Sequence, residues 1–453
     1  PAPSPAMPAS SGPLHFLAIG GGPTPESNEV SLEQDIELVQ RTLPAPGLVL
    51  FAGGSGSASV RELAPVAGDP LRLALGDLFA PRTGRQSRYR QPRFGAERAT
   101  LTNVEERLGA ALSRGDAPLL VYIAAHGERG DDPKQNSVAL WGGHALSVAR
   151  LAQLHEQHRR PLRLVATSCF SGGFGELAFA GADAAIGKPS RVPRCGLFAG
   201  TADRETSGCD PNPDRRAQES YGLHLAHALS GHRRDGSALP LELEDFDRSG
   251  GVGLLDAHTW ARIEAVSVDV PTTTSERWLR QAEAGSAAID HALLPEDAAV
   301  VERLGATLGL RSEAAVRKRW AALDRQLSEL DDAIGAAEDA LGERTADLGT
   351  EVLERWPVLD DPFHPDFEPT LQQNRAPLEA LLRASAAAQA RQEADARARG
   401  LYARLDTLAV DEARVLRVLR AYETLHKASA LLARGGPAAR YYEQLLACER
   451  GLP

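Results

Sequence analysis

The stretch LRLVATSCF, residues 162–170, is an apolar run that ends in a cysteine and a phenylalanine and leads into Ser-Gly-Gly. Four similar runs are LHFLAIGGG from Leu14, LVLFAGG from Leu48, LLVYIAAHG from Leu119 and CGLFAGTA from Cys195. Amphipathic stretches such as LEQDIELVQRTL and NVEERLGAALSRG lie between runs of this kind. Continuous apolar runs that alternate with helices predict a mainly parallel sheet with helices on both faces. The expected fold class is therefore α/β.

The composition sets limits on the function. The chain has 453 residues, of which 43% are hydrophobic and 25% charged, which is enough for two or three globular domains. No apolar run approaches the length of a membrane span. The net charge of −11 argues against a nucleic-acid partner, because such binders are usually basic.

The character of the sequence changes along the chain and predicts three parts. Residues 1–13 are a Pro/Ala/Ser-rich tether, residues 14–270 form the α/β domain, and residues 271–453 form a helical domain. The chain begins at Pro1 without a methionine, so we expect either that a signal segment was removed or that the chain was trimmed. An extracytoplasmic or secreted location is favoured over a cytoplasmic one.

The helical domain has the pattern of a coiled-coil-like hairpin. A near-heptad apolar seam is followed by the proline-rich WPVLDDPFHPDFEP and then by a second helical stretch over 376–435. We expect two or more long antiparallel helices that offer a surface to a protein partner. The seam comprises Leu327, Leu330, Ile334, Ala337, Leu341, Leu348 and Val352.

The four cysteines are too few for a disulfide scaffold and lack the paired CxxC spacing of zinc sites. Cys195 and Cys209 are close enough in sequence to close a small disulfide loop in an oxidising compartment, and this pairing stays open. Taken alone, Cys169 is more often a small buried residue than a nucleophile.

A histidine at the end of another apolar run changes that interpretation. His126 and Cys169 both follow predicted strands, so in a parallel sheet they emerge at the same edge. A thiol becomes a useful nucleophile when a base removes its proton, and His126 is the natural base. Gly127 and the pair Gly172–Gly173 are expected to leave room for a substrate backbone and for an oxyanion.

The two motifs AAHGERG and TSCFSGG resemble the His-Gly and Cys signatures of the caspase/legumain clan of cysteine peptidases, over roughly residues 1–270. The resemblance implies a caspase-like sheet, His126 as general base and acid, and Cys169 as nucleophile. It also implies an oxyanion hole from the backbone N–H groups of Gly127 and Cys169. By similarity to a legumain-type segment, Asn28 would orient the imidazole.

The segment DRETS resembles an element of metacaspases whose Asp lines the pocket for the residue before the cut. Carried over, Asp203 would favour Arg or Lys in the substrate, with Ser168 and Glu205 as neighbouring pocket residues. Specificity for Asp stays open, because it would need an arginine such as Arg204 or Arg215. Asn specificity of the legumain type stays open as well.

An arginine-rich stretch is a candidate for self-processing. PRTGRQSRYRQPRFGAER, residues 81–98, reads as an exposed loop, and an enzyme that cuts after Arg could cleave itself within residues 82–93. A solvated linker that simply follows the arginine content of the chain is the alternative.

DFDRSGGVGLLD, residues 245–256, follows the pattern of an EF-hand calcium loop. The loop carries Asp, not Glu, at position twelve, and only a weak helix precedes it. We expect Ca²⁺, in a regulatory or structural role, with an acidic helix-capping turn without metal as the alternative. The ligands would come from Asp245, Asp247, Ser249, the Gly251 carbonyl and Asp256.

These observations predict a cysteine endopeptidase that acts on protein or peptide substrates through a thioester acyl-enzyme. It would be self-processing and calcium-modulated, and its chemistry needs no cofactor. Two alternatives stay open. One is a catalytically idle member of the same fold that works through its helical arm, and the other is a doubly wound ligand-binding domain.

Overall fold

The computed structural model describes residues 13–64, 68–80, 86–282 and 285–452. The chain divides into two compact units. The first comprises the described residues of 1–63, 88–320 and 412–453, and the second those of 64–87 and 321–411. This division differs from the expected boundary at residues 270–271, because the C-terminal helices belong to the first unit. The expected tether lies almost wholly outside the described residues.

The main sheet of the first unit has six strands in the order β11-β10-β9-β5-β1-β2 within the described residues. All pairings are parallel except that of β10 with β11. The five predicted strands are confirmed, and the antiparallel edge strand was not anticipated. The strands are β1 (Phe16–Gly21), β2 (Gly47–Phe51), β5 (Leu119–Ala125), β9 (Leu162–Ala166), β10 (Arg194–Phe198) and β11 (Thr272–Thr273).

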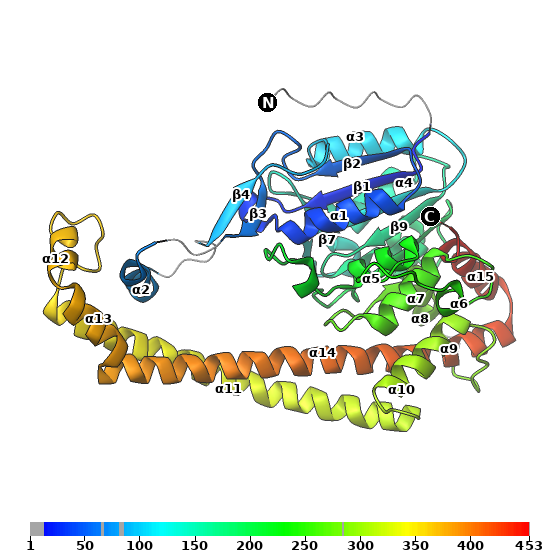
Figure 1. Cartoon of the computed structure of the whole chain (residues 1–453). Coiled ribbons are helices and arrows are strands. Elements are labelled where there is room, and N and C mark those ends of the chain that lie inside the picture. Colours follow the sequence, from blue (N-terminus) through cyan, green and yellow to red (C-terminus); the bar gives the residue numbers. More distant parts are fainter. Residues whose placement is uncertain (1–12, 65–67, 81–85, 283–284, 453) are drawn as a thin grey trace. The chain divides into compact units, whose positions relative to one another are not determined.

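Apolar side chains cover both faces of this sheet, as the continuous apolar runs predict. On one face, Leu17, Val121 and Leu164 pack in a buried cluster with residues of α3 (Leu101–Leu112) and α4 (Val148–His155). On the other face, Tyr122 and Val165 lie against α1 (Val30–Thr42) and α5 (Tyr221–Ser230). Figure 1 shows α3 and α1 on opposite sides of the sheet.

Short polar caps begin several of these helices. Thr100, Ser147 and Ser220 each precede a helix, and their hydroxyls accept a backbone N–H of the first turn.

Two small sheets accompany the main one, β3–β4 and β6–β7–β8. They consist of β3 (Val60–Leu63), β4 (Ser87–Arg90), β6 (Gly127–Glu128), β7 (Ser137–Leu140) and β8 (His144–Ser147).

The C-terminal end of the chain returns to the sheet. Helix α15 (Pro437–Glu449) packs against β10 and α8, and Cys448 forms a disulfide with Cys195. The open Cys195–Cys209 pairing is therefore not the one found. Cys195 lies near the start of β10, whereas Cys209 lies in the loop that leaves the opposite end of that strand. The remaining helices of this region are α6 (Leu241–Glu244), α7 (Leu254–Glu264), α8 (Thr274–Gln281), α9 (Pro295–Ala299) and α10 (Gly305–Thr307).

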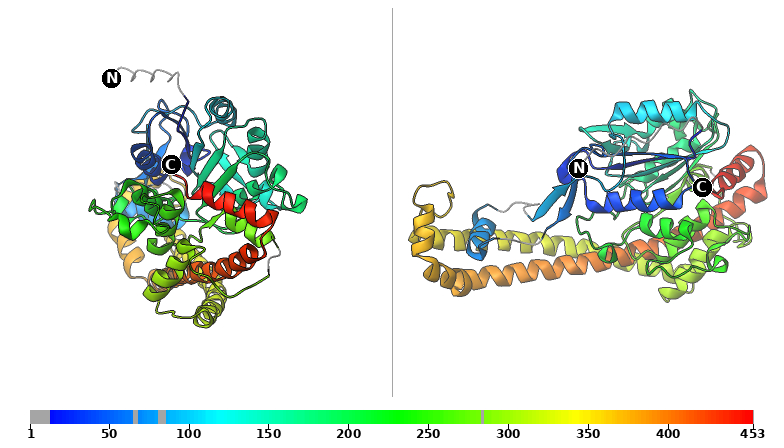
Figure 2. Two further views of the ribbon diagram at one scale, coloured as in Figure 1. Left: turned by 90° about the vertical axis from the view of Figure 1, so that its right-hand side faces the viewer. Right: turned by 45° about the horizontal axis from the view of Figure 1, so that its top comes forward.

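The second unit is helical. It contains most of α11 (Glu313–Arg355), the first half of α14 (Ala386–Arg434), and the shorter α2 (Pro70–Phe79), α12 (Phe367–Gln373) and α13 (Arg375–Ala384). Leu348 and Val352 of the predicted seam are buried among these helices. Side chains of α11 and α14 also meet directly, as Arg391 donates to the Thr345 hydroxyl, and Figure 2 shows the two helices side by side. The expected long antiparallel helices are thus present.

Among the described residues, no helix combines the length and the apolar character that a membrane span requires.

Candidate active site

The pairing of β5 with β9 brings His126 and Cys169 to the same level of the sheet edge. Ile123 lies opposite Ala166 in this parallel pair, and the Thr167 N–H donates to the Ile123 carbonyl at 2.9 Å. His126 and Cys169 each follow three positions after this pair, just beyond the carboxyl ends of β5 and β9. Their backbones stay adjacent, since a Cβ added at Gly127 would lie 1.8 Å from the Cys169 carbonyl oxygen. Glycine is therefore required at position 127.

The imidazole of His126 is held from the Nε2 side. This nitrogen lies 2.8 Å from the Ser27 carbonyl oxygen and 3.0 Å from a carboxylate oxygen of Glu29. Both oxygens can only accept from a ring nitrogen, so Nε2 carries a proton and Nδ1 is the atom that can take or give one. Glu29 is buried and is also paired with Arg61 at 3.4 Å.

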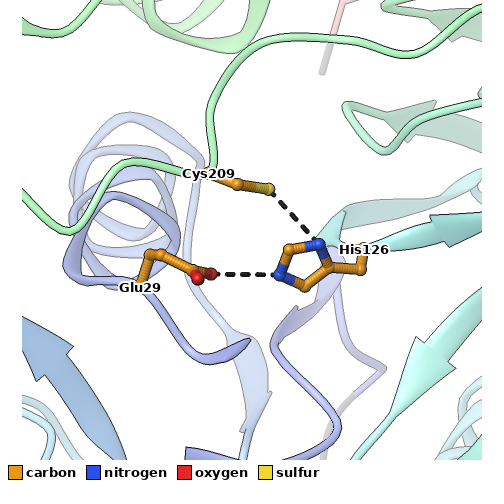
Figure 3. Close-up of side chains that lie close together, drawn as sticks. All are labelled: Glu29, His126 and Cys209. Carbon is orange, nitrogen blue, oxygen red and sulfur yellow. Dashed lines mark hydrogen bonds and ion pairs between the residues drawn. The ribbon is translucent and has the colours of Figure 1, made fainter. Parts of the chain in front are cut away.

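The Nδ1 atom of His126 faces a residue that the sequence did not single out. Cys209 Sγ lies 3.6 Å from it (Figure 3). The hydrogen bond to Cys209 and the one to Glu29 raise the pKa of His126 from 6.5 to about 11. In this arrangement the imidazole is therefore held in its charged form.

Asn28, expected to orient the imidazole, has another role. Its buried side chain accepts from the Gly22 N–H at 3.1 Å and donates to the Ser59 carbonyl at 3.0 Å. It thus fixes the loop after β1, and its neighbour Glu29 contacts the histidine. The only sequence signal for Glu29 is an acid at the start of a predicted helix, which is common for other reasons.

Cys169 is half-buried and lies against the loop that follows β10. Its Sγ accepts the backbone N–H of Thr206 at 3.3 Å. Phe170, directly after it, has a left-handed φ of 57°, which turns the chain sharply away from the strand.

Gly172 and Gly173 do not leave room for a substrate, contrary to the expectation. Both are buried, and the chain's own backbone fills the space beside them. A Cβ at Gly172 would lie 2.6 Å from the Ala202 nitrogen, and one at Gly173 would lie 2.7 Å from the Pro133 carbonyl oxygen. These glycines serve internal packing.

The expected pocket residues differ in their exposure. Asp203 and Glu205 are exposed on the loop after β10, whereas Ser168, directly before the cysteine in the sequence, is buried. Burial alone would raise the pKa of Asp203. The hydrogen bond from the Thr201 hydroxyl, at 2.7 Å, opposes this effect, and the resulting pKa is lowered. The Asp203 carboxylate is therefore charged at neutral pH.

The two arginines considered for Asp specificity already have acidic partners. Arg204 binds the carboxylate of Glu412, and Arg215 binds that of Asp35. A substrate carboxylate would have to displace these partners.

The candidate self-processing segment is only partly described. Residues 82–85 lie outside the described residues, but Arg88 and Arg90 belong to β4. Both donate to the buried carboxylate of Glu62, at 2.6 and 2.9 Å, and Arg90 also binds Glu33. Cleavage at either of these two arginines would first require β4 to detach.

Glu29, His126 and Cys209 could also be considered as metal ligands, because one ligand atom of each lies within 4.8 Å of the others. However, the carboxylate and the thiol contact different ring nitrogens (Figure 3). One metal ion binds a single nitrogen of a histidine. The contacts therefore fit a hydrogen-bonded triad better than a metal centre.

The acidic loop at 245–256 forms a second cluster, in which oxygens of Asp245, Asp247 and Asp256 lie within 4.8 Å of one another. Asp245 accepts the N–H groups of Ser249 and Gly250, and Gly250 has a φ of 92°. The Ser249 hydroxyl lies 3.3 Å from the Gly251 carbonyl oxygen.

Asp256 is the most buried member of this cluster. Its two oxygens accept the N–H groups of Phe246 and Gly253, both at 2.9 Å, and it lies in the first turn of α7. Burial raises its pKa to about 6.

Comparison with known proteins adds no identification: no protein-family model matches the chain, and no curated protein matches its sequence.

The environment of His126 leads to a pH prediction for Glu29→Gln. A raised pKa in the folded state means that the charged imidazole stabilises the fold below about pH 6.5 and that this contribution is lost as the pH rises toward 11. We expect Glu29→Gln to lower the pKa of His126. We also expect it to lower the free energy of unfolding by roughly 1–3 kcal/mol at pH 6, and by less at pH 10.

NMR titration of histidine-labelled protein measures the pKa, with His126→Asn to assign the signal, and urea unfolding measures the stability. Glu37→Gln, within the helix α1 that begins directly after Glu29, is the control. A His126 pKa near 6.5 in both wild type and Glu29→Gln would contradict the prediction.

Proposed function

We propose that this protein is a cysteine endopeptidase that uses Cys169 as nucleophile and His126 as general base and acid. The observation that carries the proposal is the contact of Gly127 with the Cys169 backbone, which brings the residue after His126 beside the cysteine at the carboxyl ends of neighbouring parallel strands. The fixed Nε2–H of His126 supports it further, because Nδ1 is left as the proton-transferring atom.

The reaction would be amide hydrolysis in two steps. The Cys169 thiolate attacks the substrate carbonyl carbon, and His126 gives a proton to the leaving amine as the C–N bond breaks. Water then hydrolyses the thioester, with His126 accepting its proton, and releases the acid and the free thiol. Glu29 and the Ser27 carbonyl would hold the imidazole in position throughout.

We propose a basic residue before the cleaved bond. The exposed, charged carboxylate of Asp203 supports this preference, since it could bind a guanidinium or ammonium group. The ion pairs of Arg204 and Arg215 disfavour a substrate Asp at that position.

A catalytically idle interaction module is the second candidate. It is favoured by one observation, namely that the facing partner of His126 Nδ1 is Cys209, while Cys169 Sγ contacts Thr206. A protein of this kind would bind partners without cleaving them.

A panel of fluorogenic peptides that differ only in the residue before the cut, assayed in reductant, separates these candidates. We expect cleavage after Arg and Lys, and a fall in kcat/KM of at least about a thousandfold in Cys169→Ala. Asp203→Asn should lower kcat/KM for the Arg peptide by about tenfold or more, because a charge-assisted hydrogen bond is lost. Asp214→Asn, an exposed acid further along the same connection, is the control. Equal turnover by wild type and Cys169→Ala, or none by either, would contradict the proposal.

We further propose that the loop at 245–256 binds Ca²⁺ through Asp245, Asp247, Ser249, the Gly251 carbonyl and Asp256. The convergence of three carboxylates supports this, because a divalent cation would relieve their repulsion. The N–H bonds to Asp256 leave lone pairs for a cation. Arg450, at 3.8 Å from Asp247, already supplies some positive charge.

Titration calorimetry of the full chain with CaCl₂ tests this second proposal. We expect binding that is weakened by Asp247→Asn and unaffected by Asp235→Asn, an exposed acid outside the loop. The affinity should rise between pH 5 and 7, because protons compete for Asp256, whose pKa is about 6. Absence of a binding heat, together with an unchanged melting temperature in CaCl₂, would contradict the proposal.

A further inference from the structure

The two free cysteines of the chain both lie at the candidate active site. Cys195 and Cys448 are joined in a disulfide, which leaves Cys169 and Cys209 as free thiols. Cys169 is half-buried and Cys209 is exposed. A thiol beside a catalytic cysteine is chemically significant, because it can react with that cysteine once the latter is oxidised.

One short segment, residues 206–210, contacts the thiol of Cys169 and carries that of Cys209. Its first residue, Thr206, donates its N–H to Cys169 Sγ at 3.3 Å, and three residues later Cys209 Sγ lies 3.6 Å from His126 Nδ1. The chain turns between them at Gly208, whose φ is 117°. Because Thr206 contacts Cys169, Cys209 contacts His126, and Gly127 contacts the Cys169 backbone, this segment lies against the carboxyl ends of both β5 and β9.

Hydrogen bonds anchor this segment on both sides. Ser207 donates its N–H and its hydroxyl to Asp269, both at 2.7 Å. Ser31 donates its hydroxyl to the Gly208 carbonyl at 2.6 Å and accepts the Asp210 N–H at 2.8 Å. The Cys209 thiol is therefore kept at the site by the fold. The chain around its sulfur desolvates the thiol and, with Glu29 and Cys169, raises the pKa of Cys209 although the residue reaches the surface, and the hydrogen bond with His126 opposes that effect.

We propose that Cys209 is the resolving thiol of Cys169, so that a peroxide converts the pair into a reversible Cys169–Cys209 disulfide. First the Cys169 thiolate attacks the peroxide, the O–O bond breaks, and a sulfenic acid and hydroxide form. The Cys209 sulfur then attacks the Cys169 sulfur, the S–O bond breaks, and water leaves with the Cys209 proton. Two thiols are oxidised as one peroxide is reduced.

This inference rests on the proposed function only for the reactivity of Cys169. The disulfide would remove the nucleophile and also the group that faces His126, so activity would stop until a thiol reductant restores both cysteines. A second consequence is protection, because a sulfenic acid that is resolved quickly escapes irreversible oxidation to sulfinic acid.

The test is peptide mass mapping of the intact chain after limited hydrogen peroxide, in wild type and in Cys209→Ser. We expect a linked Cys169–Cys209 peptide in wild type that dithiothreitol removes, and several-fold faster formation of sulfinic acid on Cys169 in the variant. The Cys195–Cys448 peptide serves as an internal standard, and Cys209→Ala is a second variant in case Cys209→Ser folds poorly.

Absence of the linked peptide, with equal rates of sulfinic acid formation in wild type and variant, would overturn the inference. Both readouts are masses and need no turnover. If the linked peptide forms but no peptide substrate is cleaved, the redox inference stands and the proposed peptidase function fails.

Discussion

The parallel pairing of β5 with β9 is the constraint on which the rest of the site depends. The ladder that places Ile123 opposite Ala166 brings the segments that carry His126 and Cys169 out at the same edge of the sheet, and a shift of one residue would turn every side chain of one strand to the other face. The absence of a Cβ at Gly127 allows the two strand ends to stay in contact beyond the ladder. Sheet register thus sets the geometry of the proposed catalytic pair.

The loop after β10 completes the site, and its position depends on the C-terminal half of the chain. Asp269 holds Ser207, and the segment around Asp269 is itself held by the buried Arg417 of α14. Arg417 donates to the carbonyl oxygens of Ala265, Ser267 and Asp269, each at 2.7 Å. Because buried carbonyls without partners are costly, this guanidinium keeps the segment in one conformation. The C-terminal helices therefore support the loop that contacts Cys169 and carries Cys209.

The sequence predicted the strands, helices and site residues that depend on a local pattern of residues. Apolar runs identified five strands, the near-heptad seam identified the long helices, and strand ends pointed to His126 and Cys169. It could not reveal Glu29, Cys209 or the Cys195–Cys448 pairing, because each depends on contacts between distant segments. Gly172 and Gly173 illustrate the same limit, since a glycine that admits a substrate and one that admits the chain's own backbone look identical in sequence.

The central claim is that His126 controls the reactivity of Cys169. The most direct measurement is the pH dependence of Cys169 alkylation by iodoacetamide, followed by mass mapping in wild type and His126→Ala. The account predicts that Cys169 is alkylated several-fold more slowly in His126→Ala than in wild type across the neutral pH range, because the imidazole that promotes thiolate formation is absent. Identical pH profiles for the two proteins would contradict it.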